Sequence, residues 1–192
     1  LFNPNPYLLS PLLNHKEALI KISYDDVRNF RINLFKNKEK KNIHNFLWLN
    51  LVDRKNKNET IQKIIREWIN KYSKYTKGVW DERLTSLRII SWISNADLIL
   101  NTSDKDFNRS FCKNIIRQIN FIKNNINNLS DENKKVSSIS LLVLSGLVFK
   151  EYYINYSLGL KELKKFIYNN FDDNGFPINR NFEKLLTFVQ YF

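Results

Sequence analysis

The chain has 192 residues, of which 43% are hydrophobic and 14% aromatic, a composition typical of a folded domain with a buried core. Only four glycines and four prolines are present, which argues against an all-β sandwich or barrel because such folds need frequent turn residues. The formal net charge of +12 fits a polyanionic partner. It fits an A/T-rich coding sequence equally well, because Lys, Asn and Ile are abundant together.

The ends of the chain indicate a piece of a larger protein. The sequence contains no methionine, begins at Leu1 and stops at Phe192 inside an apolar run. No secretion signal is visible, and a missing start would remove one. The longest apolar run, residues 139–149, is far shorter than the ~20 residues of a membrane-spanning helix, so no membrane span is predicted.

Two regions are predicted in chain order. Residues 1–40 form an irregular N-terminal segment, because Asn3-Pro4-Asn5-Pro6 and Ser10-Pro11 are turn signals. Within it, weak alternation over residues 20–35 is compatible with a short strand pair. Residues 41–192 form one helical domain, truncated at its C-terminal end.

The helical region carries one apolar pattern after another. The clearest lies over residues 60–72, where apolar side chains repeat at intervals of three and four and form a single stripe. Residues 84–100 are apolar on nearly all sides, which predicts a buried helix, and Ser130 or Asp131 is a predicted cap. The predicted helices cover residues 42–53, 60–72, 84–100, 104–129, 131–152, 158–171 and a last stretch that begins near 181.

Helices of this length joined by short loops predict an all-α fold of stacked antiparallel helical hairpins. Two arrangements fit, an open solenoid and part of an incomplete (α/α) toroid. A solenoid is expected to show a signature repeated at a fixed period. No such signature is visible in the sequence, which favours the toroid.

Conventional catalytic motifs are missing. The chain contains no phosphate-binding loop, no dinucleotide fingerprint, no zinc-ligand spacing and no serine-hydrolase elbow, so no metal and no cofactor are predicted. His15 and His44 lie in unrelated contexts and are interpreted as structural. Cys112 is the only cysteine, which excludes an intrachain disulfide and predicts a small core residue.

The segment Gly78–Trp92 is the first of two with chemical potential. Arg88 stands inside an otherwise apolar helix, and a buried guanidinium must be paired or face a cavity. Near it, Trp80 and Trp92 supply rings of the kind that stack on sugars, while arginine binds carboxylates through two parallel hydrogen bonds. The alternative is that Arg88 pairs with Asp81 or another acid and ties the core together.

The segment Asp172–Asn181 is the second. A tight turn at Gly175 and a proline precede the sequence Asn179-Arg180-Asn181 at the start of a helix. Such a loop is able to present polar groups to a ligand. The alternative is a plain turn in which Asn179 or Asn181 caps the helix.

Taken together, these segments resemble bacterial heparinase II/III-like proteins in order and spacing over about residues 40–190. The matching stretches are Phe46-Leu47-Trp48-Leu49, Trp68-Ile69, Trp80 through Arg88 to Trp92, Ser145-Gly146-Leu147, and Asp173-x-Gly175 through Asn179-Arg180-Asn181. The resemblance implies the N-terminal helical part of a polysaccharide lyase, with an incomplete (α/α) toroid followed by β-sandwich domains. It also implies a periplasmic or cell-envelope location.

The chemistry implied by the resemblance is β-elimination at the uronic acid of an acidic polysaccharide. The uronate carboxylate must be neutralised, a base removes the C5 proton and an acid protonates the leaving oxygen. By resemblance, the substrate-binding residues would be Arg88, Arg180, Trp80, Trp92, Asn179 and Asn181. The catalytic base and acid would lie mostly beyond Phe192.

The sequence also departs from the family. Many such lyases carry an Asn-His pair on a toroid helix, where this chain has Lys135-Val136-Ser137-Ser138-Ile139, and some have a histidine where this chain has Phe176-Pro177. The alternative function is therefore a non-catalytic helical module that binds an acidic glycan or a protein. Nucleic-acid binding is disfavoured, because the basic residues are scattered over every helix.

Overall fold

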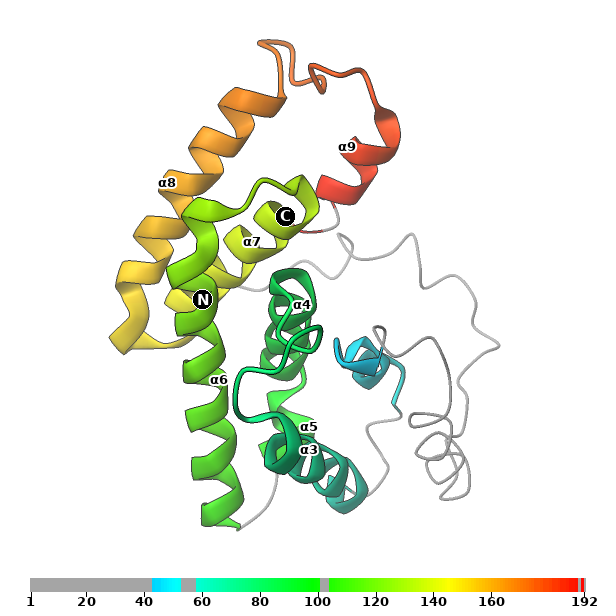
Figure 1. Cartoon of the computed structure of the whole chain (residues 1–192), viewed down its shortest axis with the longest axis vertical. Helices are drawn as coiled ribbons and strands as arrows, with labels where there is room; N and C mark the ends of the chain where they lie inside the picture. Colours follow the sequence, from blue (N-terminus) through cyan, green and yellow to red (C-terminus); the bar gives the residue numbers. More distant parts are fainter. Residues whose placement is uncertain (1–42, 53–57, 101–103, 190, 192) are drawn as a thin grey trace, which may run out of the picture.

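The computed structural model describes residues 43–52, 58–100, 104–189 and 191, and within these ranges the chain is helical without a strand (Figure 1). The predicted all-α fold is confirmed. The irregular segment 1–40, with its proposed strand pair, lies outside the described residues. The α-helices are α3 (Asn58–Tyr72), α4 (Glu82–Ser94), α5 (Ala96–Leu100), α6 (Lys105–Asn125), α7 (Glu132–Val148), α8 (Tyr153–Asn170) and α9 (Phe182–Val189), and the short 3₁₀ helices are η2 (Leu47–Leu51), η3 (Ile126–Asn128) and η4 (Lys150–Tyr152).

Short polar side chains decide where four of the helices begin. Asp81 accepts from the backbone amides of the first turn of α4, Asp104 does so for α6 and Asp131 for α7. The side chain of Asn181 accepts from the backbone amide of Lys184 in α9. Each cap satisfies amides that have no partner inside the helix. The predicted cap at Asp131 is therefore confirmed.

Four of the predicted helices differ from the observed ones. Residues 84–100 form two helices, because Asn95 leaves helical geometry at φ −115° and ψ 25° and its side-chain amide binds Ser91 and Asn50 instead. Residues 42–53 hold only the short η2, which follows Phe46 in a left-handed conformation. The helix predicted to reach residue 152 ends at Val148, and α8 begins at Tyr153 rather than at 158.

Helices α4 and α7 pack side by side and run parallel. Lys134 on α7 contacts Glu82 on α4 at 2.8 Å, and one turn further Ser138 lies 3.4 Å from Ser86; both pairs are separated by 52 residues. The same separation of 52 recurs between Glu132 and Lys184, which join α7 to α9. These three helices, called the inner helices below, thus begin at the same end of the molecule.

The inner helices carry a repeat that sequence inspection missed. Their capping residues, Asp81, Asp131 and Asn181, stand 50 residues apart. The period of 50 residues appears in the helix starts and in an ion pair that occurs twice, as Glu82–Lys134 and as Glu132–Lys184. It does not appear as a shared sequence signature. The absence of a repeated signature, noted in the sequence, is therefore unchanged.

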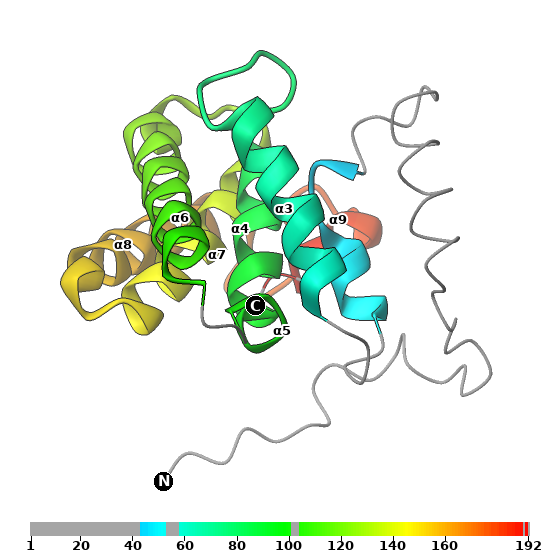
Figure 2. The same ribbon diagram turned by 90° about the horizontal axis from the view of Figure 1, so that it is seen from below.

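Between the inner helices, the other long helices run back in the opposite direction. Helix α6 contacts α3, α4 and α7 (Figure 2), and α8 packs along α7 as an antiparallel hairpin. That hairpin is close because a Cβ atom at Gly146 would overlap the backbone of Tyr156 and one at Gly159 would lie 2.7 Å from Val143. Glycine permits such an approach.

The core contains a cluster of aromatic rings. Trp92 lies at its aromatic centre, 5.1 Å from the ring of Phe46, 5.4 Å from that of Trp68 and 5.1 Å from that of Phe111. Pairs of aromatic rings at these separations stabilise the fold by more than the burial of their apolar area alone. Cys112, next to this cluster in sequence, is exposed, so the prediction of a core cysteine is wrong because the apolar stripe of α6 passes through Phe111 and Ile115 instead.

Candidate functional site

The candidate site lies where the inner helices begin. We call this region the N-terminal face and define it as the first turns of α4, α7 and α9 with the loop Phe171–Arg180. At the top of Figure 1 this loop connects α8 to α9. The face joins the two segments that the sequence singled out, because one precedes α4 and the other precedes α9.

Ion pairs hold the three first turns together. Lys134 lies 2.6 Å from Asp81 and 2.8 Å from Glu82, while Lys184 lies 2.8 Å from Glu132. Burial alone would raise the pKa of Asp81, but hydrogen bonds from Lys134 and from two backbone amides lower it overall. The same contacts, Asp81 first and then Glu82, raise the pKa of Lys134. Both groups are therefore charged at neutral pH.

The loop Phe171–Arg180 is organised by one carboxylate. Asp172 accepts from the amides of Asn174 at 3.0 Å and Phe176 at 2.9 Å, and its second oxygen lies 2.7 Å from the guanidinium of Arg180. Hydrogen bonding by the Phe176 amide is the largest cause that lowers the pKa of Asp172. Gly175 adopts φ +78°, as the predicted turn requires. That turn is confirmed.

Arg180 is an exposed charged group of this loop. Its side chain is 66% exposed, and its guanidinium lies 6.0 Å from the centre of the Phe176 ring. The backbone of Arg180 has φ +54°, an unfavourable conformation for a residue with a side chain. The loop therefore holds the residue in a strained conformation that presents it at the surface.

Asn179 and Asn181 are exposed, and both organise the backbone. Asn179 accepts from the amide of Asn181 at 3.0 Å, and Asn181 accepts from the amide of Lys184 at 3.2 Å. The interpretation as a turn with a helix cap is thus confirmed. Their role in substrate binding stays a prediction, because each side-chain oxygen already accepts one of these bonds.

The three remaining predicted binding residues lie in the core. Arg88 and Trp92 have no exposed surface and Trp80 is only 4% exposed. A sugar has no access to these side chains in this packing, so their observed placement differs from the predicted one. The physical reason is that η2, α6 and α7 cover α4.

Arg88 ties four parts of the chain together. Its guanidinium donates to Gln118 at 2.7 Å, to the carbonyl of His44 at 2.7 Å, to the carbonyl of Val79 at 3.2 Å and to the hydroxyl of Thr85 at 3.0 Å. It also lies 4.4 Å from the Trp68 ring. These partners are neutral groups, not Asp81 as the alternative prediction held. Burial lowers the pKa of Arg88 to about 9, which leaves it charged at pH 7.

His44 is the one histidine among the described residues, and its lone pair is occupied. Its Nδ1 atom accepts from the indole of Trp68 at 3.0 Å. Burial, followed by the nearby charges of Arg88 and Lys71, lowers the pKa of His44 to about 4. A histidine whose acceptor nitrogen is already engaged is a poor general base. The structural interpretation of His44 agrees with these contacts.

One group on the N-terminal face escaped sequence reasoning. The hydroxyl of Tyr191 accepts from Arg83 at 3.3 Å across 108 residues of sequence. This contact brings a phenol, one of the side chains used as a general base, to the same end as Arg180. Periodicity does not reveal a tertiary contact of this kind.

No family model, curated protein or solved structure gives a significant match to this chain. None of the described helices combines the length and apolarity that crossing a bilayer requires.

Proposed function

We propose that this chain is the N-terminal helical part of a heparinase II/III-like polysaccharide lyase that acts by β-elimination on a uronic-acid-containing polysaccharide. The observation that carries the proposal is that two distant segments lead into helices whose first turns are linked through α7. Residues 78–83 and 171–181 both lead into inner helices, and the ion pairs of α7 link these helix starts. Both segments belong to the resemblance described above.

The arrangement of helices also supports the proposal. Helices α4 and α7 run parallel while α6 and α8 return in the opposite direction, an alternation that an incomplete (α/α) toroid also has. In such a layout, the loops that precede the inner helices gather at one end. On this face Arg180 would neutralise the uronate carboxylate, and Asn179 and Asn181 would contact hydroxyl groups beside it.

The buried residues have a different part in the proposal. Arg88, Trp80 and Trp92 would act through the fold, since Arg88 binds the carbonyl of Val79 just before α4 and Trp80 donates to the carbonyl of Tyr72 at 2.9 Å. They fix the segment that leads to Asp81. We regard them as positioning residues for the N-terminal face.

A second function is a non-catalytic module that binds an acidic glycan, favoured by a specific observation. The stretch in place of the family's Asn-His pair is buried in α7, with Ser137 and Ser138 fully covered. Ser138 lies against Ser86 of α4. Residues 136–139 of this stretch therefore offer no group to a carboxylate on the surface.

A lyase assay on the full-length gene product separates the two functions. Alginate, heparin, heparan sulfate, hyaluronan and chondroitin are supplied in turn, and the ultraviolet absorbance of the unsaturated uronate is followed. We expect a rise with one polymer that Arg180→Ala reduces at least tenfold, while Arg109→Ala, an exposed arginine on α6, leaves it unchanged. A flat trace with every polymer, combined with retained glycan binding, would favour the non-catalytic module.

A further inference from the structure

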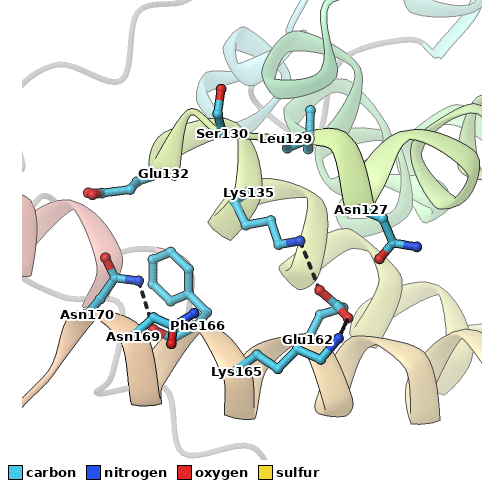
Figure 3. A pocket seen from close by; sticks show the side chains of 10 residues that line it. All are labelled: Asn127, Leu129, Ser130, Glu132, Lys135, Glu162, Lys165, Phe166, Asn169 and Asn170. Carbon is cyan, nitrogen blue, oxygen red and sulfur yellow. Dashed lines mark hydrogen bonds and ion pairs between the residues drawn. The ribbon is translucent and has the colours of Figure 1, made fainter.

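A pocket of about 440 Å³ opens between the start of α7 and the last turns of α8 (Figure 3). This volume lies in the range of small-molecule sites. The walls come from Asn127 on η3, Lys135 on α7, and Glu162, Lys165, Phe166 and Asn169 on α8. Arg180 does not line the pocket, and the loop that holds Arg180 touches it only through Asn170, whose carbonyl accepts from the amide of Ile178 at 2.9 Å.

A buried carboxylate organises the charges of the pocket. Glu162 is only 3% exposed, and its two oxygens lie 2.9 Å from Lys135 and 2.8 Å from Lys165. Lys135 also donates to the carbonyl of Ile126 at 2.7 Å. Figure 3 shows Lys135 reaching down from α7 and Lys165 running along α8 to the same carboxylate. Two cations around one anion leave a surplus of one positive charge.

The other carboxylate at the pocket does not cancel this surplus. Glu132 also lines the pocket, but its carboxylate is paired with Lys184 at 2.8 Å. Lys165 has a side chain that is 56% exposed, and Glu162 takes one of the three N–H groups that an ammonium carries. Donors of Lys165 therefore remain for a ligand that enters from solvent.

The uncharged groups narrow the class of ligand. Asn127 and Asn169 are exposed amides on opposite sides of the pocket, and each offers both a donor and an acceptor. Paired donors and acceptors match hydroxyl groups, while Phe166 adds an apolar wall. A single surplus charge suits a carboxylate rather than a doubly charged phosphate.

We propose that this pocket binds a sugar acid, that is, a monosaccharide with one carboxylate, either free or as a unit of an acidic glycan. Lys165 would bind the carboxylate, and Asn127 and Asn169 would bind the hydroxyl groups. The binding requires no elimination chemistry, so the proposal stands or falls separately from the lyase function.

The test is a titration of the ¹⁵N-labelled chain with sodium glucuronate, followed by nuclear magnetic resonance. We expect the side-chain amide signals of Asn127 and Asn169 to shift and to saturate. Lys165→Ala should weaken binding about tenfold or more, because a hydrogen bond between charged groups is lost. Glu162 keeps Lys135 as a partner in this variant, and circular dichroism checks that the fold is retained.

Lys164→Ala is the matched control, because Lys164 is an exposed lysine on the same helix outside the pocket. It should bind glucuronate within twofold of the unchanged chain. Glucose, which has the same ring without the carboxylate, should not saturate the signals. Equal shifts with glucose, or equal affinity of the Lys165→Ala and unchanged chains, would overturn the proposal.

An oligosaccharide with internal glucuronate units identifies the source of the ligand. Shifts of the same two amides would assign the pocket to units of an acidic glycan. Binding of free glucuronate alone would assign it to a free sugar acid. Binding of neither would overturn the proposal, and the lyase assay with Arg180→Ala would remain an independent measurement.

Discussion

Replacing Arg88 distinguishes a structural role from a ligand-binding role. Arg88→Ala removes four hydrogen bonds and the contact with Trp68, and it leaves acceptors of three other segments buried without a partner. Leaving a buried acceptor without its donor costs about 1–3 kcal/mol, so the loss at three segments is a large share of the ~5–15 kcal/mol that stabilises a typical domain. Arg88→Lys should lose most of the same free energy, because lysine lacks the planar fork of donors.

Urea denaturation followed by circular dichroism measures the free energy of unfolding of both variants. Arg109→Ala is the control, since an exposed arginine should change this free energy by no more than about 0.5 kcal/mol. If Arg88→Ala unfolds at the same urea concentration as the unchanged chain, the guanidinium does not hold the core together. Direct binding of a ligand by Arg88 would then be the better explanation of its position.

Two further changes test the packing and the ion pairs. Gly146→Ala should lower the free energy of unfolding by about 1–3 kcal/mol in urea, because the new methyl group overlaps the backbone of Tyr156; a more stable variant would mean that α7 and α8 are not so closely packed. Asp81→Asn should cost about 0.5–1 kcal/mol at pH 7 by removing the charge that faces Lys134. The folded-state pKa of Asp81 lies below its ordinary 3.8, so this contribution to stability is present above about pH 4 and is lost as the pH falls further. The free energies of unfolding of Asp81→Asn and of the unchanged chain should therefore converge near pH 2. A difference between them that stays constant with pH would contradict the ion pair.

The helices were predictable where local chemistry decides their limits. Asp131 was predicted as the cap of α7, and the α6 helix was predicted to begin at Asp104, since a cap acts within one turn. The start of α4 was predicted at residue 84, two residues after its observed start at Glu82. The break at Asn95 was not predictable, because it depends on a hydrogen bond to Asn50, far away in sequence. Because residues 84–100 are apolar on nearly all sides, their burial was predicted correctly. The same pattern gives no sign of the break between α4 and α5.

The site was predictable only in part, for a related reason. Sequence pattern showed that Arg88 is buried, but the partner of a buried arginine comes from whichever helix crosses it, here Gln118 of α6. The turn at Gly175 was predicted because glycine favours its positive φ. The 50-residue spacing of helix starts was visible as Asp81, Asp131 and Asn181, but single capping residues differ too little from other polar residues to reveal a repeat.

In the loop Phe171–Arg180, Asp172 would compete with the proposed substrate, because its carboxylate already binds the guanidinium of Arg180. Asp172→Asn keeps an oxygen acceptor for the amides of Asn174 and Phe176 and removes the charge that pairs with Arg180. An ion pair with so exposed a partner contributes little, because solvent screens the two charges. Freeing Arg180 should therefore tighten binding of an acidic glycan by about two- to fivefold.

Asp173→Asn is the matched control, since it changes the net charge equally one residue away on an exposed side chain. The non-specific attraction of a chain with a net charge of +12 then cancels in the comparison. On immobilised heparin, Asp172→Asn should elute at a higher salt concentration than Asp173→Asn. Elution at the same salt concentration would mean that Arg180 gains nothing from the loss of its partner, and the loop would then have no part in binding the glycan.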